Sequence, residues 1–178
     1  MTHLAKKKAI LWDNDGVLVN SEQLFYKTNR EFFYEMGIDL TPQNFFDWYL
    51  HGNCGAWHLL NVPDEQIAEL RAERNIRHQR SLAQAAGLQI AGIDQVLAQM
   101  PTHLRMGIVT SARRVDFMTI HAKLNLLPHF EFVLAEGDYA QSKPAPDPYL
   151  AGIERLALAA HDCLHHRRHR QRSGRCDA

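Results

Sequence analysis

Two carboxylates stand one residue apart, directly after a short apolar run near the start of the chain. Residues 9–12 read Ala-Ile-Leu-Trp and lead into Asp13, Asn14, Asp15 and Gly16. Such a run is typical of a strand buried on both faces of a parallel sheet, and these sheets bind ligands where their strands end. Residues i and i+2 of an extended segment point to the same side, so Asp13 and Asp15 would crowd one site. This arrangement is costly unless a cation or a reaction needs both carboxylates; the alternative is a solvated turn that closes the strand.

Two hydroxyl residues and a lysine follow later in the chain. A second apolar run ends in the hydroxyl residues Thr110 and Ser111, which by themselves could simply begin a helix. Lys143 lies in the segment Ser-Lys-Pro-Ala-Pro-Asp of residues 142–147, where two prolines fix the backbone around the cation. Phosphoryl transfer requires a nucleophile, a proton donor, positive charge near the phosphate oxygens and usually Mg²⁺. The carboxylate, hydroxyl and ammonium groups of these segments suit that chemistry.

In their order along the chain, these segments resemble the motifs of the haloacid dehalogenase-like (HAD) superfamily. Residues 13–18 resemble its nucleophile motif DxDGVL, Thr110-Ser111 its second motif, and Lys-Pro-Ala-Pro-Asp its third. The resemblance covers roughly residues 8–163 and is greatest to the branch that contains β-phosphoglucomutases and small-molecule phosphatases.

The resemblance implies a Mg²⁺-dependent phosphohydrolase that acts on a small, sugar-phosphate-like metabolite. Asp13 would attack phosphorus and form an aspartyl-phosphate, while Asp15 would act as general acid and then as general base. Thr110, Ser111 and Lys143 would bind the phosphate, with Lys143 also offsetting repulsion between the carboxylates and the phosphate. Asp13 and Asp15 would bind Mg²⁺.

The same branch leaves β-phosphoglucomutase-type phosphoryl transfer as an alternative. In the mutases a cap histidine assists proton transfer, and Phe25 occupies the corresponding position of this chain. This departure favours hydrolysis of a phosphate ester.

The elements that must position these residues follow the α/β pattern of a Rossmann-like parallel sheet. Further strands are predicted at residues 105–110 and 130–135, and helices at residues 92–100, 115–124 and 148–159. Three helices interrupt this pattern after the first strand and predict an inserted α-helical cap; they cover residues 21–36, 41–50 and 63–85. We therefore expect a HAD core at residues 1–18 and 84–164, a cap at residues 19–83 and a separate basic tail at residues 165–178.

The composition fits one globular domain with an insertion. The chain has 178 residues, and 46% of them are hydrophobic, which is enough for a packed core. No apolar run reaches about eighteen residues, so we expect no membrane partner.

Cys54, Cys163 and Cys176 lie far apart without CxxC spacing. We therefore expect neither a zinc site nor a disulfide framework, and a reducing, cytoplasmic location.

The residues from 165 onward differ in composition from the rest of the chain. They hold five arginines, three histidines and one acid, and the remainder carries 15 basic and 19 acidic residues. In the family, a further strand and an acidic pair, the fourth motif, complete the Mg²⁺ site near this position. Residues 164–170 instead read Leu-His-His-Arg-Arg-His-Arg, and arginine cannot bind Mg²⁺. We therefore expect no fourth strand, an exposed apolar edge at residues 9–12, poor solubility and strongly reduced or absent turnover.

A frameshift near codon 165 is one hypothesis that explains both the tail and the missing motif. Degenerate codons allow residues 165–177 to be encoded so that a frame shifted by one nucleotide reads Ile-Ile-Glu-Asp-Thr-Ala, with Glu at position 167. An inactive frameshifted remnant of a phosphatase or mutase is therefore a further alternative, and the nucleotide sequence of the gene tests it.

Two other interpretations fit parts of the sequence. A phosphoacceptor signalling module also combines acids, a hydroxyl residue and a lysine on a parallel sheet. Its phosphorylated aspartate follows the third strand, however, and it lacks a helical insertion after the first. The basic tail could contact nucleic acid, but it has no interleaved aromatic residues, so we expect no nucleic-acid partner. The expected partner is a small phosphorylated metabolite.

Overall fold

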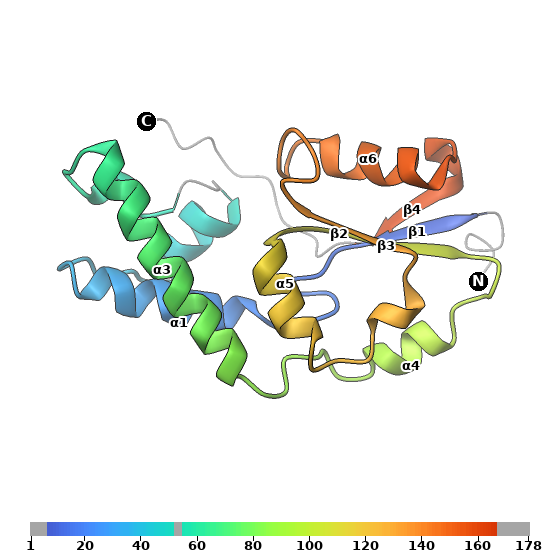
Figure 1. The fold of residues 1–178 in the computed structure, drawn as a ribbon, viewed down its shortest axis with the longest axis horizontal. Helices are drawn as coiled ribbons and strands as arrows, with labels where there is room; N and C mark the ends of the chain where they lie inside the picture. Colours follow the sequence, from blue (N-terminus) through green and yellow to red (C-terminus); the bar gives the residue numbers. More distant parts are fainter. Residues whose placement is uncertain (1–6, 52–54, 167–178) are drawn as a thin grey trace. The chain divides into compact units, whose positions relative to one another are not determined.

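The described part of the chain consists of two compact units. The structure is a computed structural model, and it describes residues 7–51 and 55–166. Residues 7–21 and 86–166 form an α/β unit, here called the core unit; residues 22–51 and 55–85 form the helical unit (Figure 1). Most of the predicted basic tail, including position 167, lies outside the described residues, as do Cys54 and Cys176.

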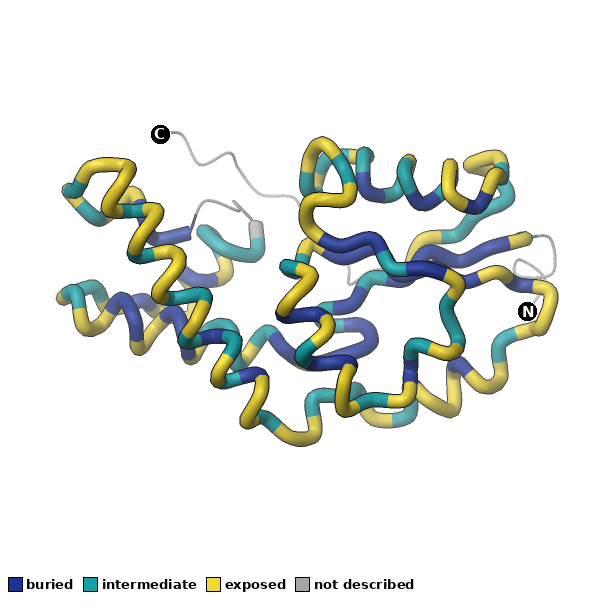
Figure 2. Tube along the Cα trace, in the orientation of Figure 1, coloured by how far each residue is buried: buried dark blue, intermediate teal, exposed yellow. Residues whose placement is uncertain are grey.

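The core unit is built on a parallel sheet. Its strands are β1 (Ala9–Trp12), β2 (Arg105–Arg113), β3 (Phe132–Glu136) and β4 (Cys163–His166), arranged in the order β3-β2-β1-β4. β1 pairs with β2 on one side, with Ala9 opposite Arg105. Because β1 lies inside the sheet, all four of its residues are buried (Figure 2). The Rossmann-like parallel sheet predicted from the sequence is thus confirmed.

The prediction that the fourth strand is missing was wrong. β4 pairs in parallel with β1, with Ala9 opposite Cys163 and Trp12 opposite His166. Strand pairing uses main-chain N–H and C=O groups, which the two histidines of β4 supply as well as apolar residues do. The rings of Trp12 and His166 also pack together, with their centroids 5.0 Å apart. β4 therefore covers β1, and residues 9–12 are not the exposed apolar edge that the sequence predicted.

Helices cover both faces of this sheet. α6 (Asp147–Leu156) packs on β1 and β2, while α5 (Arg114–His121) packs on β2 and β3 from the opposite side, where α4 (Ile93–Ala98) also lies (Figure 1). A Cβ atom at Gly152 of α6 would lie 2.9 Å from Leu11, so glycine permits this close approach of helix and strand. α6 ends earlier than the predicted residue 159 because Ala157 adopts a left-handed conformation with φ 51°.

The helical unit holds the three helices predicted after the first strand. α1 (Glu22–Tyr34) and α3 (Asp64–Gln84) pack against each other. The predicted helix at residues 41–50 begins as α2 (Pro42–Phe45) and continues as the π-helical segment Phe46–His51. The Thr41 hydroxyl caps α2 by accepting a hydrogen bond from the Asn44 N–H at 3.2 Å. No helix among residues 7–51 and 55–166 is long and apolar enough to cross a membrane.

Candidate active site

The chain turns sharply where β1 ends, and this turn carries both aspartates. The Asn14 N–H donates to Asp13 Oδ1 at 2.9 Å, and the Asn14 carbonyl accepts hydrogen bonds from the amides of Leu18 and Val19 at 2.8 and 3.1 Å. Gly16 adopts φ 75°, a left-handed conformation that glycine enters at little cost. The turn therefore holds the carboxylate of Asp13 at the carboxyl edge of the sheet.

Lys143 makes an ion pair with Asp13. Its Nζ atom lies 2.8 Å from Asp13 Oδ1, and both side chains are at least four-fifths buried, with 15% and 19% exposed. The same Nζ donates to the Val109 carbonyl of β2 at 2.7 Å and lies 5.1 Å from the centre of the Tyr149 ring. These three contacts fix the ammonium group at the ends of β1 and β2. Partial burial strengthens its attraction for an anion, because the local dielectric is lower than in water.

Asp15 has a different set of partners. Its Oδ2 atom accepts a hydrogen bond from the Thr110 hydroxyl at 3.2 Å, and its Oδ1 atom accepts one from the Ser21 hydroxyl. Thr110 is fully buried, and its carbonyl accepts a hydrogen bond from the Tyr139 hydroxyl at 2.7 Å. The crowding expected of two carboxylates is therefore relieved by separate partners: an ammonium group for Asp13 and two hydroxyls for Asp15.

The structure brings together four of the five residues singled out from the sequence. Asp13 contacts Lys143, and Asp15 contacts Thr110, across the ends of β1 and β2. Ser111 follows Thr110, but its side chain is exposed. Sequence reasoning missed the hydrogen bond of Ser21, although this serine lies in the Val-Asn-Ser-Glu segment that follows the DxDGVL motif.

A buried histidine lies behind the turn. His121 of α5 is 3% exposed, and its Nε2 atom is 2.8 Å from Oδ1 of the fully buried Asn14. Burial lowers the pKa of His121 to about 4, although the nearby charge of Asp15 opposes this shift. The ring is therefore neutral at neutral pH, and it stacks on Phe117 with their centroids 4.1 Å apart. No sequence motif pointed to this pair.

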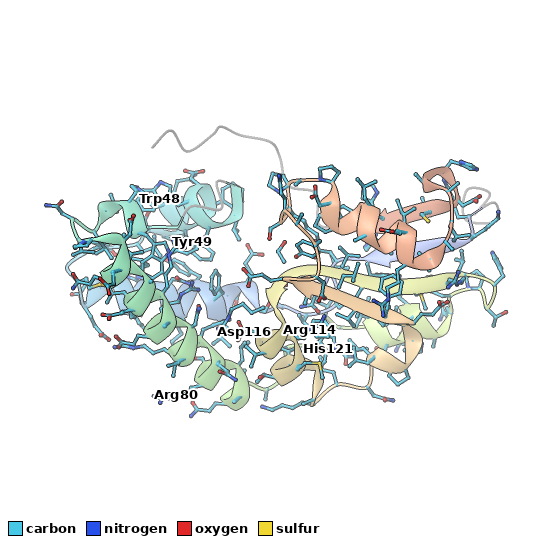
Figure 3. The ribbon with its side chains drawn as sticks, turned by 45° about the horizontal axis from the view of Figure 1, so that its top comes forward. Trp48, Tyr49, Arg80, Arg114, Asp116 and His121 are labelled. Atoms are coloured by element: carbon cyan, nitrogen blue, oxygen red, sulfur yellow. The ribbon has the colours of Figure 1, made fainter. Side chains whose placement is uncertain are left out.

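Ion pairs fix the start of α5. Arg113 contacts Asp116 at 2.6 Å, and Arg114 contacts Asp138 in the segment after β3. Arg114, Asp116 and His121 all project from α5 (Figure 3). The chain entering α5 is thereby held to the first turn of the helix, and the helix is held to the segment after β3.

Comparison with known proteins identifies the family. Residues 10–165 match the family model described as haloacid dehalogenase-like hydrolase. The chain belongs to this family. Like its HAD relatives, it is a phosphatase or hydrolase by descent, as the motifs predicted.

Individual relatives agree with this assignment. The HAD chain is 27% identical over 170 residues to protein CbbY of Rhodobacter capsulatus, and the match covers 88% of this chain and 75% of the relative. The crystal structure of Rhodobacter sphaeroides CbbY in complex with xylulose-1,5-bisphosphate is similar in fold, with a TM-score of 0.70, 18% identity and coverage of 89% and 76%. That of β-phosphoglucomutase from Clostridium difficile gives a TM-score of 0.72, 16% identity and coverage of 89% and 75%.

Proposed function

We propose that this HAD chain hydrolyses a small phosphorylated metabolite of the sugar-phosphate class through an aspartyl-phosphate on Asp13. The observation that carries the proposal is the ion pair of Lys143 Nζ with Asp13 Oδ1 at 2.8 Å, beside the hydrogen bond of Thr110 to Asp15. The complex of CbbY with a sugar bisphosphate supports the substrate class. The wide spacing of the cysteines leads us to propose a reducing, cytoplasmic setting.

Asp13 is suited to act as the nucleophile. Its Oδ1 atom is held by Lys143 and by the Asn14 N–H, whereas Oδ2 receives no hydrogen bond from the residues that the structure describes. Oδ2 would attack phosphorus, and the bond between phosphorus and the ester oxygen would break. Lys143 would attract the phosphate oxygens and keep Asp13 oriented during the attack.

Asp15 is suited to move the proton in both steps. As a carboxylic acid it would protonate the departing ester oxygen. As a carboxylate it would then take a proton from a water molecule that attacks the aspartyl-phosphate, which releases phosphate and restores Asp13. The hydroxyls of Ser21 and Thr110 can each donate and accept hydrogen bonds, so they can hold Asp15 in either protonation state.

The side chains also fit a magnesium ion, which HAD phosphatases generally use. Mg²⁺ binds proteins through one or two carboxylates and takes its remaining ligands from water and substrate phosphate. Asp13 and Asp15 would hold it. When bound, it would offset the charge of the phosphate oxygens. Within the described residues, no group of three or more acidic, histidine or cysteine side chains could hold a metal.

Hydrolysis is preferred to mutase chemistry because Phe25 has no ionisable group. This residue, at the position of the mutase histidine, packs against the rings of Phe45 and Tyr49 with centroids 5.9 and 5.7 Å away. A phenyl ring can neither donate nor accept a proton. Phosphoryl transfer within a sugar phosphate would require an acid or base there.

The test is to trap the covalent intermediate. We expect the full-length Asp15→Asn variant, incubated with p-nitrophenyl phosphate and Mg²⁺ and quenched in acid, to carry phosphate on the peptide that contains Asp13. The Asp13→Asn variant should carry none. Asp94→Asn, which changes an exposed aspartate in the first turn of α4, is the matched control and should behave as the unsubstituted chain.

The frameshift hypothesis remains a proposal, and it suggests a second arm for this test. Arg167→Glu combined with Arg168→Asp restores the acidic pair at the positions where the shifted frame places it. We expect this double variant to show greater Mg²⁺-dependent turnover than the unsubstituted chain. If the folded double variant neither hydrolyses the ester nor accepts phosphate on Asp13, the proposed function is wrong.

A further inference from the structure

Asn14 connects the turn after β1 to the rest of the core unit. Its N–H orients Asp13, and its carbonyl accepts hydrogen bonds from Val17, Leu18 and Val19 at 3.2, 2.8 and 3.1 Å. Its side chain is fully buried. Any rotation of Asn14 would therefore break the hydrogen bonds that close the turn and move the carboxylate of Asp13.

The side chain of Asn14 is held from outside the turn. His121 Nε2 lies 2.8 Å from Asn14 Oδ1, across 107 positions of sequence. The neutral imidazole carries one N–H, and the geometry assigns it to Nε2, where it donates to the amide oxygen. The stacked ring of Phe117 restricts rotation of the imidazole. α5, which follows directly after β2, thus reaches back to the residue between the two aspartates.

We infer that His121 is a positioning residue for phosphoryl transfer: through its hydrogen bond to Asn14 it holds the turn that orients the Asp13 carboxylate. The inference rests on the proposed role of Asp13 as nucleophile. The hydrogen bond that His121 makes is to Asn14 and not to Asp13, so it acts on the nucleophile through Asn14. A small displacement of a reacting group is enough to slow a reaction markedly, so a remote hydrogen bond of this kind affects turnover.

A purely structural role for His121 predicts different behaviour. If His121 only fills space in the core, an apolar residue of similar volume should preserve the turn, and any loss of stability should be spread over the core unit. If it positions Asn14, the loss should concentrate at the amides that bind the Asn14 carbonyl. Glutamine should then replace it, because its side-chain amide can donate where Nε2 does.

The experiment compares three variants of the full-length chain. His121→Leu removes the donor, and His121→Gln keeps one. Ile120→Val, a neighbouring buried position of α5, is a matched control that trims the core without touching Asn14. Two readouts are taken: amide hydrogen exchange of Leu18 and Val19, and the rate at which phosphate appears on Asp13.

In His121→Leu we expect exchange of these amides to accelerate by about fivefold or more relative to amides of β3. We expect the rate of phosphate transfer to Asp13 to fall by about tenfold with KM little changed. His121→Gln should restore both to within about threefold of the unsubstituted chain, and Ile120→Val should change neither selectively. If His121→Leu does not unfold and its turn exchanges like that of Ile120→Val, the inference is overturned. If His121→Leu unfolds, failure of His121→Gln to protect the turn overturns it instead.

The two readouts separate this inference from the proposed function. Selective exchange at the turn with no phosphate on Asp13 in any chain, the acid-restored double variant included, would contradict the function and with it the positioning role. Phosphate on Asp13 at equal rates in all three variants would contradict the positioning role alone.

Discussion

Burial of His121 makes the stability of the core unit depend on pH. The folded chain holds this ring 3% exposed, and burial lowers its pKa from 6.5 to about 4, against the opposing charge of Asp15. The unfolded chain takes up a proton on the same ring as the pH falls through its ordinary pKa. Between the two pKa values the unfolded state therefore binds more protons, and the free energy of unfolding decreases as the pH decreases.

The size of the effect follows from the two pKa values. At pH 7 the ring is mostly neutral in both states, so it contributes little. At pH 5 the unfolded ring is protonated and the folded ring is not, which lowers the free energy of unfolding by about 2 kcal/mol, at about 1.36 kcal/mol for each pKa unit. Near pH 4 the loss approaches its limit of about 3 kcal/mol.

The assay compares the unsubstituted chain with His121→Gln at pH 7 and pH 5. Glutamine does not titrate, and the carboxylates that titrate in this range are common to both chains, so their contributions cancel in the difference. Urea unfolding, monitored through hydrogen exchange of the β1 amides, reports the free energy of unfolding of the core unit alone. We expect the unsubstituted chain to lose about 2 kcal/mol more than the variant between the two pH values. Equal losses would refute the assignment of a buried, neutral histidine.

Three further predictions concern other parts of the chain. Lys143→Met should slow phosphate transfer to the nucleophile by about a hundredfold, because it removes the ammonium group, whereas Lys27→Met at an exposed helical position should not; rapid-quench labelling measures both. Gly107→Ala should lower the free energy of unfolding by about 1–3 kcal/mol, since its Cβ would lie 2.3 Å from the Phe132 ring. Urea unfolding should show that adding Phe132→Leu recovers part of this loss; no recovery would exclude the clash. Thr41→Ala should lower the free energy of unfolding by about 1 kcal/mol, because it removes the cap of α2. Thermal unfolding measures this loss, with Thr41→Ser as the control that keeps the hydroxyl.

The sequence allowed the sheet and much of the candidate site to be predicted for one physical reason. In a parallel sheet the polar residues that follow buried strands must meet at the same edge. Asp13 follows β1, and Thr110 lies near the end of β2, so their proximity could be inferred without coordinates. Lys143 belongs to no strand, and its place beside Asp13 came from the resemblance of its segment to a known motif.

Other features depend on interactions that the local sequence does not encode. No apolar run marks β4 in the sequence, because two of its four residues are exposed histidines. The strand forms because β1 offers main-chain groups with which it can pair. The contact of His121 with Asn14 spans 107 positions. From the sequence alone, a histidine in a helix cannot be distinguished from an ordinary exposed polar residue until the position of the helix is known.

The charges of the candidate site bear on its need for a metal. Asp13, Asp15 and Lys143 together carry a net charge of about −1 at neutral pH when both carboxylates are ionised, and a phosphate ester adds about two negative charges. A divalent cation would balance most of this charge, but two carboxylates attract it less strongly than four would. The unsubstituted chain should therefore require a higher Mg²⁺ concentration for half-maximal phosphate transfer than the Arg167→Glu, Arg168→Asp variant. A Mg²⁺ titration of both chains that gives the same midpoint would show that the fourth-motif acids do not act through the metal.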